Sequence, residues 1–244
     1  MDVSWEEHGW ERLDGRVGRR RLPGWDATVG LIAGPEGVLL YDTGSTVREG
    51  AEIRLQARTL LPGRRVTHVA LSHPHFDHVM GTSAFAGVEV YGAGGVDTLL
   101  RREREVLCAD AVRHGVAPDA AADAADLLVV PGRTVAGELA LDLGGGLRVL
   151  LVNAGPGHTG HDLAALVPGP AGAPPVVFCG DLVEESGEPQ AGPDAVAAGW
   201  PAALDRLLAL GGPDAVYVPG HGAVVDAAFV RAQRDALAER FAVS

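Results

Sequence analysis

The segment His73–His78, with the sequence HPHFDH, is the part of this chain best equipped for chemistry. It places three imidazoles and one carboxylate within six residues. Histidine is the commonest metal ligand among side chains, and carboxylates complement it for divalent ions. Alternation along an extended loop puts His73 and His75 on one side, while Asp77 and His78 follow where the chain can turn back. The spacing therefore predicts metal binding, with ligands for two ions.

Three further motifs lie downstream, and each follows an apolar run. The sequence GHTG occupies residues 157–160, the pair GD occupies residues 180–181, and GHG occupies residues 220–222. These motifs contain His158, Asp181 and His221.

Taken together and in this order, the four motifs resemble those of the metallo-β-lactamase superfamily, and GHTG resembles the glyoxalase-II-type loop. The likeness covers the chain from about Val29 to its end. It implies an α/β (α+β) protein with a four-layer αββα sandwich, the metallo-β-lactamase fold. The alternation of expected strands and helices agrees with two packed mixed sheets covered by helices.

The resemblance also implies a dinuclear metal site. It assigns His73, His75 and His158 to the first ion, Asp77, His78 and His221 to the second, and Asp181 to both. Seven N and O ligands without a thiolate suit Zn²⁺, two per chain, with Fe or Mn as alternatives. Two such ions can hold a bridging hydroxide and polarise a scissile bond.

Two residues are candidates for supporting roles. Asp42 follows the strand-like run Val38–Tyr41, and the resemblance implies that it supports the metal loops from outside. The alternative is that Asp42 caps a turn or the following helix. His161 lies three residues after His158, whereas the family's loop has a histidine four residues after, so a contact with substrate or metal stays open. Strand alternation predicts that Cys179 points the same way as Asp181.

The motifs require a scaffold of strands and helices. Strands are expected at Val29–Ala33, Val38–Tyr41, Val66–Leu71, Val88–Tyr91, Leu147–Val152, Leu163–Val167, Val176–Cys179 and Ala215–Val218. Helices are expected at Arg48–Leu61, Asp77–Phe85, Val96–Gly115, Trp200–Leu210 and Ala227–Phe241. Because ligands collect at the carboxyl ends of strands, these strands would deliver the motifs to one edge.

The length of 244 residues fits one domain, residues 1–244. Within it, residues 96–126 are expected to form a helical overhang near the active site, where substrate choice would be decided. The amphipathic pattern of Val96–Gly115 supports a helix there. The segment Pro118–Asp126 is expected to be a short helix or a mobile connection.

The formal net charge of −12 disfavours a nucleic-acid partner, because phosphate binding requires a basic surface. The N-terminal residues lack the pattern of a signal peptide, and no apolar run is long enough to span a membrane. We therefore expect a cytoplasmic protein with a small-molecule substrate and no membrane partner. Two cysteines without C-x-x-C spacing indicate no disulfide framework. The oligomeric state stays open.

The pattern favours a metal-dependent hydrolase that cleaves a thioester, lactone or related acyl bond, with Asp77 orienting the nucleophile while it ligates. Asp181 argues against true β-lactamase activity, because zinc β-lactamases generally lack the bridging aspartate. Three alternatives stay open: a phosphodiesterase or nuclease resembling ribonuclease Z, a mononuclear-iron persulfide dioxygenase, and a metal-loaded protein without turnover.

Overall fold

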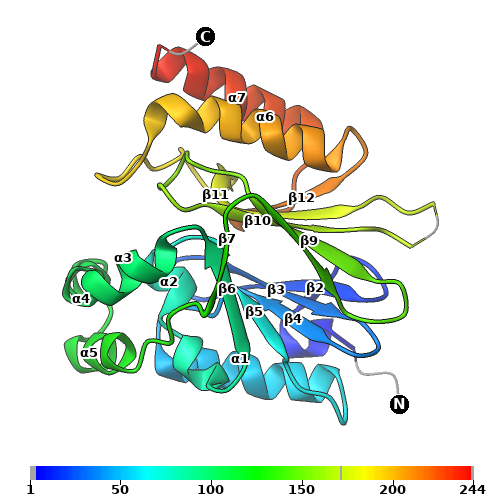
Figure 1. The fold of residues 1–244 in the computed structure, drawn as a ribbon, viewed down its shortest axis with the longest axis vertical. Helices are drawn as coiled ribbons and strands as arrows, with labels where there is room; N and C mark the ends of the chain where they lie inside the picture. Colours follow the sequence, from blue (N-terminus) through cyan, green and yellow to red (C-terminus); the bar gives the residue numbers. More distant parts are fainter. Residues whose placement is uncertain (1–3, 171, 243–244) are drawn as a thin grey trace.

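The computed structural model describes residues 4–170 and 172–242. Its strands form two sheets that face one another, and helices cover the outer face of each sheet (Figure 1). The predicted αββα sandwich is therefore confirmed. No helix in the described ranges combines the length and apolar character that crossing a membrane requires.

The first sheet has seven strands in chain order. They are β1 (Glu11–Arg12), β2 (Val17–Arg21), β3 (Thr28–Ala33), β4 (Val38–Tyr41), β5 (His68–Ala70), β6 (Glu89–Ala93) and β7 (Arg133–Val135). Strands β1 to β4 pair antiparallel, and β4 to β7 pair parallel. Because β4, β5 and β6 run in the same direction, their carboxyl ends meet at one edge.

The second sheet has five strands in the order β12-β11-β10-β9-β8. They are β8 (Glu138–Asp142), β9 (Arg148–Asn153), β10 (Leu163–Val167), β11 (Val176–Glu184) and β12 (Val216–His221). Only the pair β11–β12 is parallel among these strands. This parallel pair carries Asp181 and His221 toward the same end of the sheet.

Three longer helices cover the sheets. Figure 1 shows α1 (Val47–Leu60) beneath the first sheet, and α6 (Trp200–Gly211) with α7 (Ala227–Arg240) above the second. Side-chain caps define the starts of α1 and α7: Thr46 accepts from the N–H of Glu49, and Asp226 accepts from that of Phe229. The shorter helices are η1 (Glu6–His8), α2 (Phe76–Val79), η2 (Thr82–Phe85), α3 (Val96–Arg102), α4 (Arg104–Arg113), α5 (Pro118–Asp126) and η3 (Ala197–Gly199).

Three apolar clusters match the three interfaces between the four layers. Ile53 of α1 belongs to the cluster on the outer face of the first sheet. Phe178 lies in the cluster between the sheets, and Trp200 lies in the one beneath α6 and α7. All three side chains are fully buried. Burial of apolar area in these interfaces is the main force that holds the two halves of the site together.

The structure corrects several expected elements. The segment Val96–Gly115 is two helices, because the backbone of Glu103 leaves the helical region between α3 and α4. The expected helix Asp77–Phe85 is likewise divided into α2 and η2. Strands β1, β2, β7 and β8 were not predicted, since they are short or rich in charged residues such as the three arginines of β2.

Candidate metal centre

The seven donors predicted from the sequence lie together at the edge where the strands end. The loop after β5 carries His73 and His75, and α2 carries Asp77 and His78. The loop between β9 and β10 carries His158, and β11 and β12 carry Asp181 and His221. Their side chains form two groups, and within each group the donor atoms lie within 4.8 Å of one another. The groups are His73, His75, His158 and Asp181, and Asp77, His78 and His221.

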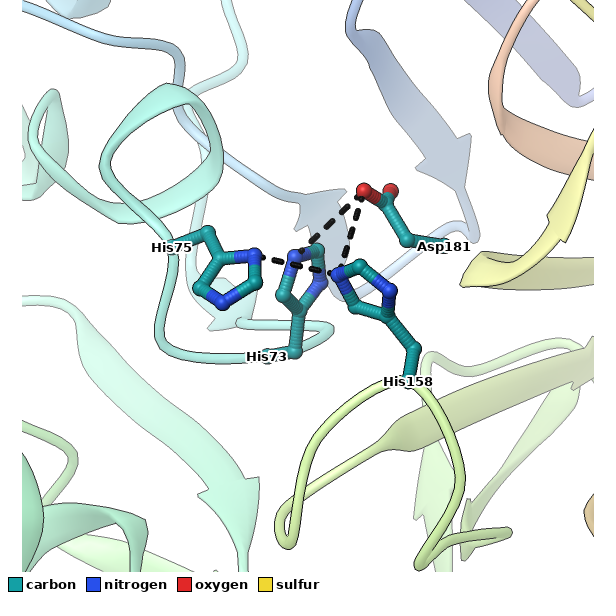
Figure 2. A group of neighbouring side chains, drawn as sticks. All are labelled: His73, His75, His158 and Asp181. Carbon is teal, nitrogen blue, oxygen red and sulfur yellow. Dashed lines mark hydrogen bonds and ion pairs between the residues drawn. The ribbon is translucent and has the colours of Figure 1, made fainter. Parts of the chain in front are cut away.

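In the first group, three imidazoles converge on one carboxylate (Figure 2). Nε2 of His158 lies 3.0 Å from Nδ1 of His75. Oδ2 of Asp181 lies 3.6 Å from Nε2 of His73 and 3.5 Å from Nε2 of His158. These nitrogens and this oxygen are the atoms that would face a shared ion.

In the second group, Nε2 of His78 and Nε2 of His221 face each other at 3.4 Å. Oδ2 of Asp77 lies 3.6 Å from the first of these nitrogens and 3.4 Å from the second. Asp181 also approaches this group, with Oδ1 3.2 Å from His78 and Oδ2 3.3 Å from His221. Asp181 therefore lies between the two groups, where a bridging ligand would be.

Hydrogen bonds behind the second group determine which imidazole nitrogens are free. The backbone carbonyl of Trp25 accepts from Nδ1 of His221 at 2.7 Å, and Asp42 pairs with Nδ1 of His78 at 2.9 Å. A carbonyl oxygen can only accept, so the proton of His221 is on Nδ1. The carboxylate of Asp42 favours the same tautomer in His78. In the neutral form of each ring, Nε2 is then the nitrogen that can offer a lone pair to a metal ion.

The first group has similar partners for two of its histidines. Nδ1 of His73 lies 2.8 Å from Oγ of Ser72, and Nε2 of His75 lies 3.0 Å from Oδ2 of Asp194. Nδ1 of His158 is buried without a hydrogen-bond partner in the described ranges. Outer partners of this kind orient metal-binding imidazoles and raise their basicity.

Asp42 occupies the supporting position that the family resemblance implied. Its Oδ1 accepts from the backbone N–H of Ser72 at 2.7 Å, and its Oδ2 faces His78. The carboxylate thus connects the start of the metal loop with a donor at its end. Helix α1 is capped by Thr46 instead, so the alternative of a helix cap at Asp42 is wrong.

The electrostatics of the two groups favour a bound cation. Burial lowers the pKa of His73 well below its usual value and that of His158 to about 4, so both imidazoles are neutral. Burial also acts against the charge of His221, but Asp181 outweighs it and raises the pKa of His221 to about 9. Nε2 of His73 and Oδ1 of Asp181 are buried and have no hydrogen-bond partner in the described part of the chain. Five imidazoles and two carboxylates without a thiolate fit Zn²⁺, Fe or Mn.

A cavity of about 760 Å³ opens over both groups. One wall is apolar and consists of Trp25, Phe76 and side chains from α3 and α4, including Leu99 and Val106. The ring of Phe76 stacks on that of His114 with centroids 5.4 Å apart. The side chains that α3 and α4 add to this wall belong to the segment expected to overhang the site, whereas α5 contributes no residue to the lining.

Another part of the lining is acidic. The residues from 184 to 194 that line it include Glu184, Glu188 and Asp194, and α4 adds Asp110. Arg113 is the one arginine among the described lining residues, and it pairs with Asp110 at 2.9 Å. The cavity therefore offers no unpaired guanidinium to an anionic substrate.

Two residues considered from the sequence lie outside both groups. Nδ1 of His161 lies 2.9 Å from the carbonyl of Gly94, and its side chain does not line the cavity. Cys179 lies in the apolar cluster beneath α6, whereas Asp181 faces the histidines. The expected common direction is wrong because Gly180 has a φ of 55° and the β11–β12 register shifts there, which breaks the alternation.

Sequence reasoning missed Trp25, Asp194 and Glu184, which contact or neighbour the donors. Asp194 is 119 residues from His75 and Trp25 is 196 residues from His221. Trp25 acts through its backbone carbonyl, which no side-chain pattern reveals. Glu184 could have been found only by extending the strand Val176–Cys179 to its full length.

Comparison with known proteins agrees with the motifs and the fold. The model of the metallo-β-lactamase superfamily matches residues 22–221. Metallo-beta-lactamase domain-containing protein 1 from Xenopus laevis is 34% identical over 165 residues, which are 67% of this chain and 57% of that relative. The chain thus spans little more than half the length of this curated relative.

Two solved structures share the fold at low sequence identity. The metallo-β-lactamase from Pontibacter korlensis has a TM-score of 0.72 and 21% identity, covering 93% of this chain and 97% of that one. The metallo-β-lactamase FIM-1 from Pseudomonas aeruginosa has a TM-score of 0.69 and 18% identity, covering 96% of each chain. With the family match over 200 residues of sequence and the four motifs in place, the chain belongs to the metallo-β-lactamase superfamily.

Proposed function

We propose that this protein is a hydrolase that binds two divalent metal ions and cleaves a thioester, lactone or related acyl bond. The observation that carries the proposal is the convergence of seven N and O donors into two groups that share Asp181 beneath one cavity. Shared carboxylates between neighbouring ions are typical of dinuclear hydrolytic sites.

In this proposal, His73, His75 and His158 hold the first ion, and Asp77, His78 and His221 hold the second. Asp181 contacts both. Two ions bound here would supply Lewis acidity and would lower the pKa of water to near neutrality. Zn²⁺ is the expected metal, with Fe or Mn as alternatives, because the donor set contains no sulfur.

The chain's own residues position the reaction. Asp77 faces His78 and His221 from the cavity side and lines the cavity, so its carboxylate can orient a nucleophile and accept its proton. Trp25 and Phe76, whose rings meet edge to face with centroids 5.2 Å apart, keep water from one side of the centre. An acyl group can lie against this apolar wall while its carbonyl points to the donors.

The charge of the cavity favours acyl substrates over phosphodiesters. Its acidic side chains would repel a polyanion, its one arginine is already paired with Asp110, and the net charge of −12 acts in the same direction as the acidic side chains. A nucleic-acid substrate needs unpaired basic residues along its path. A small uncharged acyl compound needs none.

The test is a turnover screen of metal-loaded protein against thioesters, lactones, β-lactams and phosphodiesters. Asp77→Ala and His158→Ala serve as blanks, and metal content is measured for every sample. His161→Ala is the matched control, because it removes an imidazole from the loop of His158 without touching either donor group. We expect acyl hydrolysis by the wild type and by His161→Ala, and a loss of at least about 100-fold in both blanks.

Other outcomes would redirect the assignment. Cleavage confined to phosphodiesters would contradict the acyl-hydrolase proposal and support the nuclease alternative. One iron per chain with oxygen uptake would support the persulfide dioxygenase instead. Full activity in metal-loaded Asp77→Ala would contradict the role given to Asp77.

A further inference from the structure

Glu184 is a buried acid at the metal centre that is not among the seven donors. It ends β11, three residues beyond Asp181, and its side chain lines the cavity. Only 8% of its surface is exposed. One of its carboxylate oxygens forms a third group with donor atoms of Asp181 and His221, all within 4.8 Å of one another.

The backbone holds Glu184 directly opposite His221. These two residues are partners across the β11–β12 pair, after a shift in register that follows Gly180. The N–H of Glu184 donates to Oε1 of Gln233 at 3.0 Å, and Nε2 of Gln233 donates to the carbonyl of Leu182 at 2.9 Å. Gln233 belongs to α7 and is buried, so the end of β11 is anchored to the helix above it.

The side chain of Glu184 is held by hydrogen bonds to one of its two carboxylate oxygens. Oε1 of Glu184 accepts from the backbone N–H of Ser186 at 2.9 Å and from its hydroxyl at 2.6 Å. Both bonds involve the same oxygen, which leaves Oε2 free to act as a ligand. The neighbouring Glu185 differs, since its Oε2 accepts from the N–H of Ala223 at 2.6 Å and is engaged in the loop.

We infer that Glu184 contributes a further ligand to the second metal ion, beside Asp77, His78 and His221; this inference rests on the proposed dinuclear function. Metal–oxygen and metal–nitrogen distances of about 2.0–2.2 Å place two ligands of one ion within about 4.4 Å of each other. The donor atoms of Glu184, Asp181 and His221, all within 4.8 Å of one another, lie in the range that a shared ion needs.

The additional carboxylate changes the character of the second site. With Asp77, Asp181 and Glu184, it has three carboxylates and two imidazoles, whereas the first site has three imidazoles and one shared carboxylate. Oxygen-rich sites suit Mn²⁺, while imidazole-rich sites suit Zn²⁺. Loss of Glu184 should therefore weaken Mn²⁺ binding at the second site more than Zn²⁺ binding.

The test is a competition titration of metal-free protein with Zn²⁺, and separately with Mn²⁺, against a chromophoric chelator. Glu184→Gln removes the charge and keeps the size of the side chain. Glu188→Gln is the matched control, since Glu188 lines the same cavity but is exposed and pairs with Arg240 at 3.2 Å. We expect Glu184→Gln to weaken the second site by about 10- to 100-fold, with the first site and the control as in the wild type.

The outcomes separate this inference from the proposed function. Two ions bound by the wild type, with an unchanged second affinity in Glu184→Gln, would overturn the role of Glu184 and leave the hydrolase proposal standing. Fewer than two ions in the wild type would overturn the dinuclear proposal itself, and the inference with it.

A second variant keeps the test decisive if Glu184→Gln disturbs the fold. Glu184→Asp keeps the charge and a hydrogen-bond acceptor, but it withdraws the carboxylate by one methylene. It should also weaken the second site, and Mn²⁺ affinity should fall more than Zn²⁺ affinity. Wild-type affinities for both metals in folded Glu184→Asp would contradict the inference.

Discussion

Asp42 supports the metal centre through two hydrogen bonds at the ends of the metal loop, to Ser72 and to His78. Its backbone has a φ of 63°, a region that asparagine and aspartate tolerate better than most residues. Asp42→Asn therefore changes the charge with little effect on the backbone. Because the tautomer of His78 depends on this carboxylate, a neutral amide at position 42 should leave Nε2 of His78 less available to a metal ion.

We expect Asp42→Asn to reduce the affinity of the second site by about 10- to 100-fold and that of the first site by less. Chelator competition measures both affinities, and circular dichroism verifies that the variant is folded. Equal losses at both sites would indicate a general disturbance of the loop instead of a specific effect on His78.

Protons should compete with metal at His221. Burial disfavours its charged form, but the carboxylate of Asp181 outweighs burial and raises the pKa to about 9 in the metal-free protein. Below pH 9 a proton therefore occupies the nitrogen that would bind metal, and binding must release it. Burial also acts against the charge of His78 in the same group, but Asp181, Asp77 and Asp42 together raise its pKa well above the usual value. Affinity of the second site should therefore rise with pH between 6.5 and 9. Chelator competition between pH 6.5 and 9.5 measures this, and a flat profile would contradict it.

Helix α4 forms part of the apolar wall of the cavity. Val106 is 60% exposed and lines the cavity, while Val112 of the same helix is 38% exposed and does not. Because neither side chain belongs to a buried core, charged substitutions at these positions should leave the fold intact. A substitution at Val106 changes the cavity wall and the helix, whereas one at Val112 changes the helix alone.

Val106→Asp should lower kcat/KM for substrates with apolar acyl groups by about tenfold, since a charge replaces apolar contact worth roughly 1–2 kcal/mol. Metal content should stay unchanged. Val112→Asp is the control and should retain the wild-type kcat/KM. An equal loss of kcat/KM in both variants would show that a disturbed helix, and not the changed cavity wall, causes the loss.

The metal centre joins the two halves of the molecule. Residues 73–78 follow β5 of the first sheet. His158 lies between β9 and β10 of the second sheet, whose strands β11 and β12 carry Asp181 and His221. An ion that binds both halves binds only the folded chain, so it stabilises that state by mass action. Zn²⁺ at 100-fold above its dissociation constant should add about 2.7 kcal/mol and raise Tm by roughly 5–10 °C.

Differential scanning calorimetry of metal-free and zinc-loaded protein measures this shift. His158→Ala lacks one of the two donors, His158 and Asp181, that the second half supplies to the first group, so its shift should be smaller. An equal Tm with and without zinc would contradict a centre built from both halves.

The sequence by itself indicated the candidate donors and most strands. Residues 73–78 are contiguous, and each later candidate lies within a few residues of an apolar run long enough to form a strand, so local patterns suffice. Strands such as Leu163–Val167 were predicted with their observed bounds. Short or charged strands such as β2 were not, because their pairing depends on neighbours and not on their own pattern.

Only the tertiary structure decided which groups surround those donors. The contacts of Asp194 with His75 and of Trp25 with His221 join residues more than a hundred positions apart. Glu184 faces His221 because the register shifts after Gly180, whose positive φ reverses the alternation that the sequence implied. Such contacts follow from how two sheets pack and where a strand bulges, and neither is encoded in a local pattern.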